Sequence, residues 1–123
     1  PPAVKKFMNY CSNASNGRDD RVKFTASWMD ENTELLVKAL LCLENEDEAY
    51  RLLDDLCTIA EIKALSQRMR VAQLLDKDTT YSVIARESGA STATISRVKR
   101  CLNYGARGYR IVLDKLQKES DHG

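Results

Sequence analysis

From Asp30 onward, hydrophobic side chains recur every three or four residues, which is the period of an amphipathic helix. The pattern predicts one helix at about residues 33–43, a second after Asn45 and a third at about residues 59–75. A last helix is predicted beyond Gly105. The hydrophobic positions are Leu35, Leu36, Ala39, Leu40 and Leu43 in the first helix, Ala49, Leu52, Leu53 and Leu56 in the second, Ile62, Leu65, Met69, Ala72 and Leu75 in the third, and Tyr109, Val112, Leu113 and Leu116 in the last.

Capping residues mark where two of these helices begin. Asn45 with Glu48, and Thr58 with Glu61, have the spacing of a capping box, in which each side chain accepts a hydrogen bond from the other residue's backbone amide. Residues 77–80 break the third helix, and Thr79 or Thr80 is the predicted cap of the next one.

Residues 81–101, Y-S-V-I-A-R-E-S-G-A-S-T-A-T-I-S-R-V-K-R-C, have the pattern of a helix-turn-helix. Ile84 and Ala85 are predicted to face inward from its first helix. Gly89 occupies the position where the chain leaves that helix, which often requires a positive φ. The alternative is a simple helical hairpin with a basic, solvated face, but it requires the inner positions, the glycine and the cap to agree by accident.

The second helix of this motif is predicted to follow Ser91, its N-cap, and to end near Asn103. Ile95 and Val98 form its inner side, which leaves a polar and basic outer face. Such a face suits the major groove of DNA, where methyl and hydroxyl groups contact base edges and cations bind phosphates. The predicted DNA-binding residues are Thr92, Ala93, Thr94, Ser96, Arg97, Lys99 and Arg100.

The composition favours an all-α protein, because only two prolines and five glycines interrupt 123 residues, of which 43% are apolar. The net charge of +1 conceals two halves of opposite sign. Residues 30–56 carry two basic and nine acidic side chains, whereas residues 81–118 carry eight basic and two acidic ones. A basic half with a helix-turn-helix is the expected footprint of a protein that binds double-stranded DNA, although two differently charged solvated faces are common.

Neither a metal site nor an active site is predicted. The four cysteines have no C-x-x-C spacing, and the only histidine, His122, lies near the end of the chain. No nucleophile has a base at a suitable spacing, so an enzyme is the weakest functional class. Neither a signal peptide nor a membrane span is readable, and we expect reduced thiols, a cytoplasmic location and no membrane partner.

Six short helices have little room to cover one another's leucines, so we expect a homodimer, formed mainly through residues 33–75, that buries them between subunits. A compact monomeric bundle is the alternative.

Residues 1–28 lack a hydrophobic period and are predicted to be a flexible tail. An added or processed segment there would explain why Met29 stands just before the first good helix. The other predicted parts are a helical dimerisation region at 29–78, the helix-turn-helix at 79–104, a C-terminal helix at 105–118 that completes the dimer core, and a polar tail at 119–123.

Two runs carry a family resemblance. They are T-I-A-E-I-K-A-L-S-Q-R-M-R-V-A-Q-L-L from Thr58, and G-A-S-T-A-T-I-S-R-V-K-R-C-L-N-Y-G from Gly89. Both runs resemble the tryptophan repressor superfamily, most closely its YerC/YecD-type branch. The similarity covers about residues 30–116. It implies a six-helix, intertwined homodimer whose fourth and fifth helices read operator DNA, and a bacterial transcriptional regulator, expected to be a repressor. The alternative is a helical interaction module whose basic face binds a protein partner.

The resemblance also implies an effector pocket, because in the tryptophan repressor the amino acid binds between the recognition helix and the third helix. The residues at the matching positions are Thr58, Arg68, Thr94, Arg97, Val98 and Cys101. Val98 replaces a Gly and fills space beside the indole, and Cys101 replaces a Ser with a poor hydrogen-bonding thiol. We therefore expect no tryptophan response, predict no cofactor and leave any other effector open. For Arg68 and Arg97 we favour a structural role over ligand binding.

Overall fold

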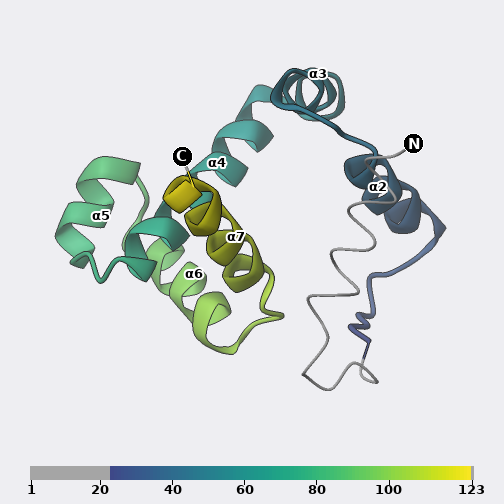
Figure 1. The fold of residues 1–123 in the computed structure, drawn as a ribbon. Coiled ribbons are helices and arrows are strands. Elements are labelled where there is room, and N and C mark those ends of the chain that lie inside the picture. The colour runs from purple at the N-terminus through teal and green to yellow at the C-terminus, as the bar shows by residue number, and fades with distance from the viewer. Residues whose placement is uncertain (1–22, 123) are drawn as a thin grey trace. The chain divides into compact units, whose positions relative to one another are not determined.

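The computed structural model describes residues 23–122, and the side chains of residues 23–120. This part of the chain forms six α-helices joined by short loops and contains no strand (Figure 1). The helices are α2 (Glu31–Leu41), α3 (Glu46–Leu56), α4 (Ile59–Asp76), α5 (Tyr81–Ser88), α6 (Thr92–Tyr104) and α7 (Gly108–His122). The prediction of an all-α fold with six helices is confirmed for this part of the chain. Most of the predicted tail, residues 1–22, lies outside the described residues.

Side-chain caps begin α3 and α4 at the predicted positions. The Thr58 hydroxyl accepts from the Glu61 amide at 3.1 Å, and the Glu61 carboxylate accepts from the Thr58 amide at 2.8 Å, which lowers the pKa of Glu61. The Asn45 side chain accepts from the Glu48 amide at 2.9 Å, as predicted. The Glu48 carboxylate, however, accepts from the Glu44 amide at 3.0 Å instead of from Asn45, so only half of that capping box forms.

Helix α2 begins two residues before the predicted start, because Asp30 and Thr33 form a capping box that the hydrophobic pattern did not reveal. The Asp30 carboxylate accepts from the Thr33 amide at 2.8 Å, and the Thr33 hydroxyl accepts from the Asp30 amide at 2.8 Å. The hydrogen bond from the Thr33 amide lowers the pKa of Asp30, because it stabilises the charged carboxylate.

The chain divides between Leu56 and Cys57 into two compact units. The predicted dimerisation region at 29–78 spans the boundary between these units and stays a prediction, because α4 belongs to the second unit, where it packs against α5 and α6. In the N-terminal unit, neither α2 nor α3 has a buried side chain. Their hydrophobic side chains lie on the surface of the single chain, and those of Leu35 and Tyr50 are 68% and 72% exposed.

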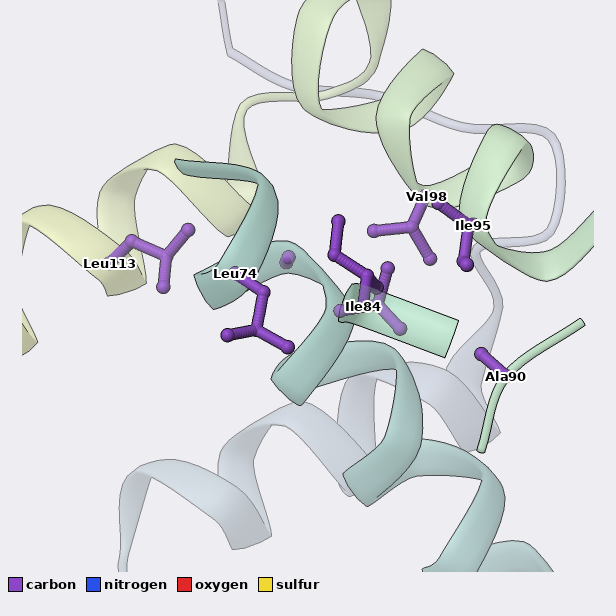
Figure 2. Packing of buried hydrophobic residues seen from close by; sticks show 8 residues of the cluster. Leu74, Ile84, Ala90, Ile95, Val98 and Leu113 are labelled. Atoms are coloured by element: carbon purple, nitrogen blue, oxygen red, sulfur yellow. The ribbon is translucent and has the colours of Figure 1, made fainter. Parts of the chain in front are cut away.

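The C-terminal unit is built around a cluster of buried hydrophobic side chains that converge from four helices and one turn (Figure 2). Helix α4 supplies Val71, Ala72 and Leu74, α5 supplies Ile84, the turn supplies Ala90, α6 supplies Ile95 and Val98, and α7 supplies Leu113. No polar or charged side chain of the described residues is buried with them. The apolar core therefore fixes the two helices of the predicted helix-turn-helix against α4.

Helix α7 is longer than predicted. It continues past residue 118 to His122, so the predicted polar tail at 119–123 is helical up to that residue. Residues 119–122 have no hydrophobic period, but they contain neither Gly nor Pro, and a helix continues through such residues without apolar contact. Arg110 anchors the other end of α7, because its guanidinium binds the Asp76 carboxylate of α4 at 2.5 Å. None of the described helices is long and apolar enough to cross a membrane.

Candidate nucleic-acid interface

The turn between α5 and α6 has the geometry that its sequence predicts. Gly89 follows the last residue of α5 with φ of +71°, in the left-handed region that favours glycine, and its amide donates to the Ala85 carbonyl at 2.9 Å. Ala90 is buried at 6% exposure. The turn therefore ends α5 sharply and brings the chain back into the core before α6 begins.

Side chains from α4 and α5 hold this turn in place. The side-chain amide of Gln67 donates to the Ser88 carbonyl at 3.2 Å. The Ser88 hydroxyl donates to the Ile84 carbonyl at 2.6 Å and accepts from the Ala90 amide at 3.1 Å. Sequence reasoning missed Gln67, because its partner lies in another helix, 21 residues away.

Ser91 is the N-cap of α6, as predicted. Its hydroxyl accepts from the Thr94 amide at 3.1 Å and donates to the Thr94 hydroxyl at 3.0 Å. Thr94 is half-buried, so of the predicted DNA-binding residues it is the one whose side chain takes part in the cap. At the start of α5, Thr80 occupies the predicted N-cap position, but its side chain forms no capping hydrogen bond.

The two sides of α6 differ as the pattern predicts. Ile95 and Val98 are 1% and 2% exposed and belong to the core. The outer side carries the remaining six predicted DNA-binding residues, all exposed, namely Thr92, Ala93, Ser96, Arg97, Lys99 and Arg100. None of the three cations among them forms an ion pair with another described residue. Their charges are therefore available to an anionic partner.

An aromatic contact links the outer side of α6 to α5. The Lys99 ammonium nitrogen lies 5.4 Å from the centroid of the Tyr81 ring, within the range of a cation–π interaction. Tyr81 is the first residue of α5 and was not among the predicted site residues. Tyr81 lies three residues before the inward-facing Ile84, so both lie on the same side of α5. This spacing is the sequence feature that could have placed Tyr81 at the edge of the surface.

The residues of the implied effector pocket have different environments. Thr58 caps α4, and Val98 is part of the core. Cys101 is a free, exposed thiol. Arg68 and Arg97 are exposed, and neither forms an ion pair with another described residue.

An apolar groove of about 480 Å³ lies elsewhere, in the N-terminal unit, and shares no residue with the implied pocket. Its lining residues are Trp28, Met29, Asp30, Thr33, Glu34, Val37 and Lys38. Within the described part of the chain, no group of His, Cys, Asp and Glu side chains is arranged to hold a metal ion.

The sequence matches a known protein family and a relative from Bacillus subtilis. The sequence model of the Trp repressor protein family matches residues 31–117. The uncharacterized protein YerC of Bacillus subtilis (strain 168) is 53% identical over 83 residues, which cover 68% of this chain and 80% of that protein.

Two crystal structures are similar to the larger part of the chain. One is a Staphylococcus aureus protein provisionally described as a Trp repressor, with 48% identity and a TM-score of 0.70 over 72% of this chain and 89% of the other. The second is a TrpR like protein from Eubacterium eligens ATCC 27750, with 51% identity and a TM-score of 0.69 over 72% of this chain and 91% of the other. The family match spans most of the chain and both structural matches cover the larger part of it, so the protein belongs to the Trp repressor family.

Proposed function

We propose that the protein is a sequence-specific transcriptional regulator that reads operator DNA with α6 and represses by occupying that operator in the bacterial cytoplasm. The observation that carries this proposal is the contrast between the two sides of α6. Its inner side is locked into the core by Ile95 and Val98, whereas its outer side presents exposed polar and basic residues without ion pairs to other described residues. A recognition helix needs both a rigid placement and free groups for DNA.

The outer residues divide by their position along α6. Thr92, Ala93 and Ser96 lie in the first part of the helix, the end that enters the major groove in helix-turn-helix proteins. We assign them to base edges. Lys99 and Arg100 lie about a turn further on, and we assign them to backbone phosphates, which fix the register of the protein on the duplex.

Two copies of the chain are part of the proposal. The single chain leaves large hydrophobic side chains exposed on α2 and on α7, where Leu113 alone is buried among the described residues. Those on α2 are Leu35, Leu36, Val37 and Leu40, and those on α7 are Ile111, Val112 and Leu116. A second copy would remove them from water. A two-fold dimer would also place two α6 helices in successive major grooves, about 34 Å apart.

Selection of bound sequences from a randomised pool of DNA duplexes tests the proposal. We expect one enriched sequence, bound roughly 1,000-fold or more tightly than random DNA, with an affinity that falls linearly in the logarithm of salt concentration. Arg100→Ala should weaken binding to every duplex. Arg51→Ala is the matched control, because Arg51 is also an exposed arginine but lies on α3.

Two results would contradict the proposal. One is the absence of an enriched sequence in the selection. The other is equal loss of affinity in the Arg51→Ala and Arg100→Ala variants. Tight binding to an acidic protein in place of DNA would favour the interaction-module hypothesis.

A further inference from the structure

The contact between Tyr81 and Lys99 has a property that an ordinary ion pair lacks. A carboxylate placed beside Lys99 would order its ammonium group but would also neutralise it. An aromatic ring attracts the cation through its quadrupole and carries no net charge. The Tyr81 ring, 5.4 Å from the ammonium nitrogen, therefore orders Lys99 while leaving its full positive charge available.

The backbone positions of both residues place this contact at the edge of the core. Tyr81 precedes the buried Ile84 by three residues, and Lys99 follows the buried Ile95 by four, so each lies one turn from a core residue on the same side of its helix. Tyr81 is 36% exposed, and Lys99 is exposed. The lysine stem thus leaves α6 toward α5, and its charged end remains at the surface.

Nearby acidic groups do not compete for this ammonium. The carboxylate of Glu87, the one acidic residue of α5, lies 3.9 Å from the guanidinium of Arg70 on α4. Lys99 itself forms no ion pair with a described residue. A flexible lysine normally loses side-chain entropy when it binds a phosphate, and part of that loss is already incurred when the ring restrains it.

We propose that Tyr81 is a positioning residue for DNA binding, which holds the Lys99 ammonium at the outer edge of the helix-turn-helix for a backbone phosphate. This inference rests on the proposed function. It adds α5 to the docking surface and assigns a role to a residue that the sequence pattern did not select. Because phosphate contacts do not depend on base sequence, a mixed-sequence duplex is a sufficient probe.

A double-mutant cycle with the full chain and a mixed-sequence duplex of roughly 30 base pairs, three turns of DNA, tests the coupling. Tyr81→Leu should weaken binding about two- to fivefold, or about 0.5–1 kcal/mol, because an unrestrained Lys99 loses its side-chain entropy only when it binds the phosphate. Tyr81→Phe keeps the ring and should bind as the wild type does. In the Lys99→Ala background, Tyr81→Leu should have no further effect.

The ring contact can also be measured without DNA. In the NMR spectrum of the free protein, the terminal methylene protons of Lys99 should be shielded by the ring, both in the wild type and in Tyr81→Phe. Tyr81→Leu should abolish the shielding. Tyr104→Leu is the matched control, because Tyr104 lies near the end of α6 and is 87% exposed.

Three results would overturn the inference alone, because the selection of bound sequences tests the proposed function separately. The first is unshielded Lys99 methylene protons in the wild type. The second is equal losses of affinity in Tyr81→Phe and Tyr81→Leu. The third is a loss of affinity from Tyr81→Leu that is as large in the Lys99→Ala background as in the wild-type background. Failure of the wild type to bind any duplex would overturn the proposed function together with the inference. The shielding in the wild type needs no variant, so the test holds even if Tyr81→Leu does not fold.

Discussion

The side-chain amide of Gln67, on α4, donates a hydrogen bond to the backbone carbonyl of Ser88, the last residue of α5, across 3.2 Å. The same amide nitrogen lies 3.9 Å from the position that a Cβ atom at Gly89 would occupy. Helix α4 therefore holds the turn of the helix-turn-helix through one polar contact as well as through the core.

Gln67→Glu should lower the free energy of unfolding by about 1–3 kcal/mol, because a carboxylate cannot donate to the Ser88 carbonyl and leaves a half-buried acceptor unpaired. The added negative charge at the C-terminal end of α5 opposes the helix dipole and acts in the same direction. Gln73→Glu is the control. Its side chain accepts a hydrogen bond from Arg70 at 2.7 Å, and a carboxylate can still accept it. Urea denaturation measures both, and equal losses would show that Gln67 does not act as a donor.

Gly89→Ala should destabilise the protein by about 1–2 kcal/mol, because an L-residue is strained at a φ of +71°. The space around the new methyl group is sufficient, so the cost comes from the backbone and not from a clash. Gly108→Ala should instead stabilise by about 0.4–1 kcal/mol, since its Cβ meets no atom within 4 Å and the substitution restricts the unfolded chain. Thermal unfolding of the two variants should move in opposite directions, and a common direction would contradict this account.

Ala93→Leu should change or abolish sequence preference, because the bulky side chain would stand between α6 and the base edges that this part of the helix is proposed to contact. Each lost base contact costs about 1–3 kcal/mol. Arg100→Ala should weaken binding to all sequences alike and reduce the salt slope by about one unit. Competition between specific and random duplexes at several salt concentrations separates these effects. Full specificity in the Ala93 variant would show that α6 docks differently.

Leu35→Glu should dissociate the proposed dimer, because a charge would replace an apolar side chain that is 68% exposed in the single chain. Tyr104→Glu places the same charge at a more exposed aromatic residue of the other unit and should leave the dimer intact. Sedimentation at micromolar concentration is the measurement, with the wild type expected at twice the chain mass of 13.9 kDa. A wild type that sediments at the chain mass would show that the protein is a monomer.

Tryptophan should not bind. The Val98 side chain, 2% exposed, belongs to the core at the position where the family resemblance implies a small residue beside the ligand. Calorimetric titration with L-tryptophan tests this, and saturable micromolar binding would contradict it. Val98→Gly combined with Cys101→Ser is the companion variant. Gain of binding in that variant would show that Arg68 and Arg97 still line a competent site.

The hydrophobic period and the caps determined where the helices lie, because both depend on residues only three or four positions apart. For this reason Thr58 and Glu61 form the predicted hydrogen bonds, and Ser91 is the predicted N-cap of α6. The same local information predicted Gly89 as the left-handed end of α5 and placed the outward face of α6. Local information placed the end of α7 too early, because the helix continues from Glu119 through polar residues that have no hydrophobic period.

Tertiary structure decided which residues meet across helices. A period shows that one side of α4 is apolar, but it does not show which surface covers that side, so the division of the chain at Leu56 was not predictable. Gln67 and Lys99 likewise have polar side chains that fit a solvated helix face in the sequence. Only the folded backbone brings Gln67 to the end of α5 and Lys99 to the Tyr81 ring, because contacts between distant residues follow from how the helices pack against one another.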